Sequence, residues 1–274
     1  MRLALAVQTP DVALTLPVAL LSGTWPEKLD RAAALGVDGL ELMTADPHDL
    51  RPGGMRQDLE SRGLNAVAIG SGAAAMQAGL TLLHADANVS ARAATRLDEL
   101  TAFAAEVGAP LVTIGSFRGR LAGAGTGARE RLADALRSAA ERAAALGVRL
   151  AIEPLNRYEA DLVNTAAEGL DFVESIGHPA LGLLLDTYHV NIEESSWEAP
   201  IRHLMQAGKL WHVHLGDNNR LPPGGGMIDF RAVVRSLRAA GYDGALSAEL
   251  LARPDPDTAA RRTVEHMRPL LEAA

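Results

Sequence analysis

The segment Arg149-Leu-Ala-Ile-Glu-Pro-Leu-Asn-Arg-Tyr-Glu159 is the most informative part of this chain. It begins as a short aliphatic run typical of a buried strand, and the run ends in a carboxylate, Glu153, followed directly by proline and polar residues. Three later aliphatic runs end in the same way, in Asp186, His214 and Glu249. Four successive predicted strands therefore each present a potential metal ligand at the carboxyl end.

Aliphatic strands alternate with helices along the whole chain. The predicted strands are residues 3–7, 37–42, 64–69, 110–114, 149–153, 181–185, 210–215 and 245–248. Helices are expected at about 24–36, 50–62, 90–107, 165–176 and 197–207, most of them bounded by a capping residue or a glycine. Three more are expected: one that Gly147 closes, one that Asp229 caps and that extends through Leu237, and a final helix that ends near Leu271.

This pattern predicts an α/β fold with a parallel sheet. Apolar runs without alternation are typical of parallel strands covered by helices on both faces. Eight such units in about 250 residues close most simply as a (β/α)8 TIM barrel, so a single barrel domain over residues 1–274 is expected. A doubly wound open sheet is the alternative. It is disfavoured because no G-x-G-x-x-G motif follows the first strand.

Composition excludes several classes of protein. Residues are 48% hydrophobic, enough for one sizeable core, and the absence of cysteine excludes disulfides and thiolate metal sites. The net charge of -8, with arginines scattered over the helices, argues against a nucleic-acid partner. No run approaches the roughly 20 apolar residues of a membrane span, so a cytoplasmic protein without a membrane partner is expected.

The four strand-end residues predict a metal site. Alternate residues of a barrel strand face the interior, so Glu153, Asp186, His214 and Glu249 should converge over the barrel mouth, where active sites lie. A single strand-end carboxylate is often only a helix cap, but four potential ligands at successive strand ends favour a shared role. Three carboxylates at close range repel one another unless a cation lies between them. Oxygen and imidazole donors favour Mn²⁺, with Mg²⁺ or Co²⁺ as alternatives and zinc less suited.

A glycine-rich stretch, Leu121-Ala-Gly-Ala-Gly-Thr-Gly127, superficially resembles a phosphate-binding loop. It lacks the lysine of a P-loop and does not directly follow a strand. We therefore interpret it as a flexible connection.

The segments EPLNRYE, LDTYHVNIEE, HVHLGDNNRLPPG and SAEL resemble the signature segments of the sugar isomerase/epimerase superfamily, which has xylose-isomerase-like barrels. The resemblance is strongest to the D-tagatose 3-epimerase and D-allulose 3-epimerase group. It is specific over residues 153–249, where the spacings between segments also match. In the first half it is limited to the order of elements and to Gly36-Val-Asp-Gly-Leu-Glu41.

The resemblance implies a ketose bound through O2 and O3 to a metal held by the four strand-end residues. Glu153 and Glu249 would also be the catalytic acid and base at C3, with the charge of a cis-enediolate stabilised by the cation. Glu159, His189 and Arg220 match positions that bind substrate oxygens at C1 to C3. The partner implied is a small-molecule sugar, and a homo-oligomer is compatible with the sequence.

Three further residues are expected near the site. His212 shares the inward parity of His214 and should lie one layer deeper, and Glu41 ends the second strand facing the same mouth. Asp217 stands where the group usually has a glutamate in its H-x-H-x-x-E segment. This departure, together with poorly matching amino-terminal segments, leaves the substrate open, because the early loops contact C4 to C6 of the sugar.

Other reactions use the same residues. An aldose-ketose isomerase of the hydroxypyruvate isomerase kind, a keto-sugar dehydratase or a C-glycoside lyase would also begin with proton abstraction beside a carbonyl. An endonuclease IV-like enzyme shares the barrel, but it needs more histidines than the 8 present and a cationic DNA face. A non-catalytic sugar-binding protein is disfavoured because all four ligands are retained.

Overall fold

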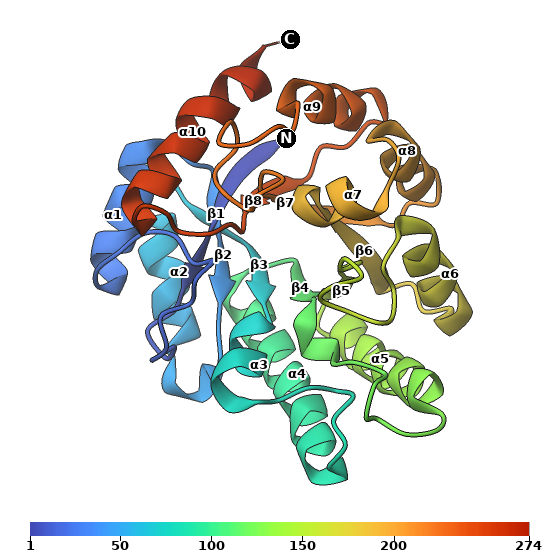
Figure 1. Cartoon of the computed structure of the whole chain (residues 1–274). Coiled ribbons are helices and arrows are strands. Elements are labelled where there is room, and N and C mark those ends of the chain that lie inside the picture. Colours follow the sequence, from blue (N-terminus) through green and yellow to red (C-terminus); the bar gives the residue numbers. More distant parts are fainter. Residues whose placement is uncertain (274) are drawn as a thin grey trace.

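A computed structural model describes residues 1–273 as a closed barrel of eight parallel strands (Figure 1). The strands are β1 (Arg2–Gln8), β2 (Gly39–Met43), β3 (Asn65–Gly70), β4 (Leu111–Ile114), β5 (Arg149–Ile152), β6 (Leu181–Asp186), β7 (Leu210–Leu215) and β8 (Ala245–Ala248). Each pairs with the next in sequence, and β8 pairs with β1, for example at Ala4 and Ser247. The predicted barrel is confirmed and the open sheet is wrong, because the sheet has no edge strand.

Helices surround this barrel. They are α1 (Trp25–Leu35), α2 (Pro52–Glu60), α3 (Gly72–Ala78), α4 (Ala87–Val107), α5 (Ala128–Ala145), α6 (Ala166–Ile176), α7 (Thr187–Glu193), α8 (Glu198–Gln206), α9 (Phe230–Ala239) and α10 (Pro256–Glu272), with 3-10 turns η1 (Pro47–Asp49) and η2 (Ser116–Arg118). In this described part of the chain, none of the helices is both long and apolar enough to cross a membrane.

Local capping explains where the helix prediction holds and where it fails. Thr165 accepts from the Glu168 N–H at 3.2 Å and starts α6 as predicted. Helix α4 starts at Ala87, before the predicted boundary, because the Asp86 side chain caps it. Helices α3 and α7 were not predicted. Each is only 7 residues long, too short for its apolar periodicity to be recognised in the sequence.

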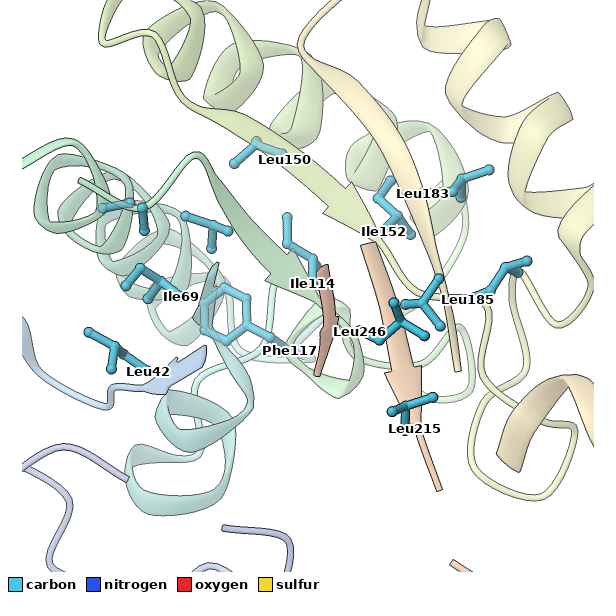
Figure 2. Packing of buried hydrophobic residues seen from close by; sticks show 14 of the residues in the cluster. Leu42, Ile69, Ile114, Phe117, Leu150, Ile152, Leu183, Leu185, Leu215 and Leu246 are labelled. Atoms are coloured by element: carbon cyan, nitrogen blue, oxygen red, sulfur yellow. The ribbon is translucent and has the colours of Figure 1, made fainter. Parts of the chain in front are cut away.

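Strand residues divide by parity between two environments. One set packs against the helices as a continuous aliphatic layer, which Figure 2 shows around Ile152, Leu183 and Leu185. The opposite set faces the barrel axis, and several of its buried members are polar: Glu41, Thr113, Asp186, His212, His214 and Ser247. The barrel interior is therefore apolar at its base and charged toward the carboxyl ends of the strands.

The base of the barrel is closed by Trp211. Its ring packs against an apolar cluster that includes Ala151 and Leu184, next to a register shift between β6 and β7. A Cβ atom at Gly182 would lie 2.6 Å from the indole ring. Glycine at this position is therefore required by the close approach of the ring.

We expect Gly182→Ala to lower the free energy of unfolding by about 1–3 kcal/mol, because the added methyl group overpacks the site against Trp211. Urea denaturation monitored by Trp fluorescence measures the change. Gly53→Ala in α2 is the matched control, since a Cβ there meets no atom within 4 Å and alanine favours the helix by up to about 1 kcal/mol. Equal midpoints for Gly182→Ala and the native protein would contradict the packing described.

Candidate metal centre

Four residues at the carboxyl ends of adjacent strands meet at one point. Glu153 follows β5, Asp186 ends β6, His214 lies in β7 and Glu249 follows β8, and one ligand atom of each lies within 4.8 Å of those of the other three. His214 Nδ1 is 3.4 Å from Glu153 Oε1 and 3.5 Å from Glu249 Oε2. The structure brings together the residues that the strand-end pattern predicts to converge.

The donor atoms of this cluster fit a divalent cation. Glu153 Oε1, Asp186 Oδ2 and His214 Nδ1 are buried and have no hydrogen-bond partner within residues 1–273. Buried polar atoms without partners are costly and rare. Asp186 Oδ1 accepts from the Tyr188 N–H at 2.8 Å, which leaves only Oδ2 for a ligand. Carboxylate oxygens and one imidazole nitrogen directed to one point are typical of a Mn²⁺ or Mg²⁺ site.

The cluster contains three carboxylates and only one imidazole, so its negative charge is not balanced without a cation. Burial raises the pKa of Glu153, and burial together with the charge of Glu153 raises the pKa of Asp186 to about 7. Burial opposes the charged form of His214, but the nearby carboxylates of Glu41 and Glu249 outweigh burial and raise the pKa of His214 well above its usual range. The carboxylates thus attract positive charge, which either protons or a metal ion can supply.

Glu41 holds the imidazole of the cluster from behind. Its Oε2 is 3.0 Å from both His212 Nε2 and His214 Nε2, and its Oε1 accepts from Thr113 Oγ1 at 3.0 Å. Burial alone would raise the pKa of Glu41, but the two imidazoles outweigh it and hold the pKa well below the usual range. An ionised carboxylate only accepts hydrogen bonds, so both Nε2 atoms carry a proton. His214 therefore directs Nδ1 into the cluster, where a metal ion can take the place of the Nδ1 proton.

The end of β5 is fixed by residues that the sequence analysis did not identify. A Cβ at Gly115 would collide with Glu153 Oε2, so the missing side chain leaves room for the carboxylate. Arg118 is completely buried and donates to the main-chain oxygens of Glu153 at 2.7 Å and Leu162 at 2.8 Å. No sequence signal marks Arg118, because an arginine in a polar stretch is normally exposed.

His189 lies in α7 beside the cluster. Its Nδ1 accepts from the Asn156 main-chain N–H at 3.2 Å, which places the proton of the neutral ring on Nε2. Burial, with the charge of Arg220, lowers the pKa of His189 to about 3, so the ring is neutral. Nε2 lies 3.8 Å from Glu153 Oε1 and 3.9 Å from Asp186 Oδ2, beyond hydrogen-bond distance. It is a free donor that faces the cluster.

Arg220 closes the opposite rim. Its guanidinium lies 3.3 Å from Glu249 Oε2, 3.4 Å from Glu159 Oε2 and 5.1 Å above the centre of the Tyr188 ring. Glu159 Oε1 accepts from Asn156 Nδ2 at 3.1 Å. Arg220 therefore lies at the edge of the metal cluster, as His189 does, and Glu159 contacts the cluster through Arg220.

Two other predicted residues, His212 and Asp217, lie outside the four-residue cluster. His212 lies one layer deeper, as expected, and contacts Glu41. Asp217 does not join the cluster, because its carboxylate is buried among four main-chain N–H groups of its own loop: those of Asn218, Gly224, Gly226 and Ile228. Asp217 therefore shapes the loop that carries Arg220 rather than touching the ligands.

A second group of potential ligands lies at the surface. Asp46, His48 and Glu99 approach one another there. Arg96 contacts both Asp46 and Glu99 at 2.6 Å, so these carboxylates already have a cationic partner. This surface group offers no orphaned buried atom comparable to those of the barrel cluster.

We expect Glu41→Gln to weaken divalent-metal affinity by about 10- to 100-fold, because the amide no longer fixes the protonation pattern of His214. Titration calorimetry with Mn²⁺ measures the change, and circular dichroism checks that the barrel persists. Glu99→Gln is the control, since it removes a carboxylate from the surface group only. If Glu99→Gln weakened binding more than Glu41→Gln, the barrel cluster would not be the metal site.

Metal affinity should depend on pH in a defined direction. The pKa of about 7 for Asp186 means that this carboxyl carries a proton below pH 7 in the metal-free protein. Metal binding must then displace this proton together with the one that His214 carries on Nδ1, so the dissociation constant should rise by at least about tenfold for each unit that the pH falls below 7. Mn²⁺ titrations at pH 6, 7 and 8 measure the slope. Equal affinity at pH 6 and 8 would show that no ligand is protonated in this range.

Comparison with known proteins places this geometry in a family. The model of the xylose isomerase-like TIM barrel family matches residues 29–270. An L-ribulose 3-epimerase of Mesorhizobium japonicum is 38% identical over 218 residues, which cover 78% of this chain and 71% of that protein. A D-psicose 3-epimerase of Ruminiclostridium cellulolyticum is 42% identical over 125 residues, which cover 45% of this chain and 42% of that protein.

A solved structure of an L-ribulose 3-epimerase superposes with a TM-score of 0.79 at 29% identity, covering 98% of this chain and 94% of that chain. The similarity extends over the amino-terminal half, where the sequence resemblance is limited to the order of the elements. These comparisons confirm the resemblance to sugar 3-epimerases. The chain belongs to the xylose isomerase-like TIM barrel family.

Proposed function

We propose that this protein is a divalent-metal-dependent epimerase that removes and returns the proton at C3 of a ketose or keto-sugar derivative. The observation that carries the proposal is the placement of two carboxylates, Glu153 and Glu249, around the point where the unpaired donor atoms of Asp186 and His214 meet. The similarity to L-ribulose and D-psicose 3-epimerases supports it.

The two glutamates are suited to act on opposite sides of a sugar carbon. Inversion of a carbon acid requires one group to take the proton from one face and a second group to deliver a proton to the other. Glu153 follows β5 and Glu249 follows β8, with β6 and β7 between them. The two carboxylates therefore approach the same space from different sides.

The surrounding residues would orient the sugar. The free Nε2–H of His189 would donate to a sugar oxygen next to the reacting carbon, and Arg220 with Glu159 would bind the neighbouring hydroxyl groups at C1 to C3. A divalent cation held by Glu153, Asp186, His214 and Glu249 would supply Lewis-acid polarisation of the sugar carbonyl. Arg220 donates a hydrogen bond to Glu249, so the proposed sugar-binding guanidinium and the proposed catalytic carboxylate are in direct contact.

The donor set supports Mn²⁺ first, with Mg²⁺ and Co²⁺ as alternatives, since three carboxylates and one imidazole suit hard and borderline ions. The isomerase and lyase alternatives would use the same residues, but the relatives reported above are epimerases. A cytoplasmic location, a homo-oligomeric state and the absence of nucleic-acid partners stay predictions from the sequence.

A deuterium-exchange experiment tests the proposal. With Mn²⁺ and a panel of ketoses in deuterated water, we expect deuterium at C3 of the product, detected by NMR. Glu153→Gln should lower turnover by about 10²- to 10⁴-fold, because an amide cannot transfer the proton. Asp186→Asn should instead lower metal content.

Glu193→Gln is the control for the loss of a carboxylate in the same region, since Glu193 is engaged by Arg157 at 2.8 Å outside the cluster. Label at C1 or C2 would indicate an isomerase, and loss of a substituent would indicate a lyase. Full activity of both Glu153→Gln and Asp186→Asn would contradict the site itself.

A further inference from the structure

A groove of about 480 Å³ opens beside the metal centre, over the carboxyl ends of β3, β4 and β5. One wall comes from α3 and the segment after it, and the facing wall comes from η2, the glycine-rich stretch and the loop after β5. Ser116 and Glu159 are among the residues that line it. Ser116 follows Gly115, which lies against the Glu153 carboxylate, and Glu159 contacts Arg220. The groove therefore continues directly from the site.

Main-chain hydrogen bonds hold the floor of the groove in place without a ligand. The Leu82 N–H donates to the Phe117 oxygen at 3.0 Å, and the Leu83 N–H donates to the Arg118 oxygen at 3.0 Å. Leu83 also forms a parallel bridge with Gly119. These bonds tie the segment after α3 to η2, so the groove needs little rearrangement to bind a ligand.

The lining combines apolar surface with hydroxyl groups. Met76, which is 47% exposed, and Leu155 provide apolar surface, and Thr81 and Ser116 provide hydroxyl groups. A sugar ring has the same character, with C–H groups on its faces and hydroxyl groups at its edge. The lining thus suits a glycosyl ring.

The charged groups around the groove already have contacts within the protein. Asp161 accepts from the Leu121 N–H at 2.8 Å and from the Ala122 N–H at 2.9 Å, so these main-chain donors are not free for a phosphate. Arg120 Nη1 donates to the main-chain oxygen of Glu159 at 3.2 Å, and Arg120 Nε lies 4.0 Å from Asp161 Oδ2. This arrangement favours a neutral occupant over an anionic one, and it agrees with the interpretation of residues 121–127 as a connection.

We propose that this groove binds a neutral glycosyl substituent of the substrate, so that the enzyme prefers a glycosyl-ketose over a free monosaccharide. The inference rests on the proposed epimerase function and adds the substrate class. The reacting ketose lies at the metal centre, and the second ring extends between Met76 and Ala122 from opposite walls.

Three sugars with a free keto group test the proposal. D-Fructose has no substituent, trehalulose has a glucosyl group on O1 and isomaltulose has it on O6. We expect kcat/KM for deuterium exchange at C3 to be at least tenfold higher for one of the two disaccharides than for fructose. The preferred disaccharide identifies which end of the ketose faces the groove.

Filling the groove should remove the preference. Met76→Trp and Ala122→Trp should each lower the ratio of kcat/KM for the preferred disaccharide to that for fructose by at least tenfold. Leu146→Trp is the matched control: Leu146 is 48% exposed, follows α5 and does not line the groove. It should leave the ratio unchanged.

The outcomes separate this inference from the function on which it rests. Exchange at C3 with fructose but no preference for either disaccharide overturns the glycosyl site and leaves the epimerase assignment intact. A preference that persists in both groove variants also overturns it, because the second ring must then lie elsewhere. The absence of exchange with all three sugars contradicts the epimerase assignment, and the glycosyl site fails with it.

Discussion

Three carboxylates and one imidazole are crowded together at the mouth of the barrel, where most of them are buried. Such a cluster is stable only if positive charge is brought to its centre, because unpaired buried carboxylates are strongly disfavoured. Below the cluster, Glu41 accepts hydrogen bonds from His212 Nε2 and His214 Nε2 and so fixes a proton on each of these atoms. Above it, Arg220 pairs with Glu249. The point between them is left for an ion.

The closed barrel makes this arrangement possible, and much of it could be predicted from the sequence. Inward-facing parity and the recurring strand ends were sufficient to predict the convergence of Glu153 and its partners. The capping residues predicted the start of several helices correctly. Capping and the parity of strand residues can both be predicted because each depends on residues that are close in sequence. The resemblance to sugar 3-epimerases added His189 and Arg220, which lie beside the cluster.

The parts that could not be predicted depend on contacts between distant segments. Arg118 reads as a surface residue until the loop after β5 folds over it. Asp217 reads as a site residue because of its position after β7, yet its carboxylate is consumed by the main chain up to Ile228. Asn156 lies inside the most informative segment, but its link between His189 and Glu159 exists only once α7 is in place.

Asp186 has one oxygen on the first turn of α7 and the other directed at the metal cluster. The same carboxylate therefore joins the ion to the helix that carries His189. A change in the charge of this carboxylate would change the acceptor strength of the oxygen that caps α7, so the charge state of the cluster and the start of that short helix are linked. An ion bound at the cluster would thus also act on the helix that positions the His189 imidazole.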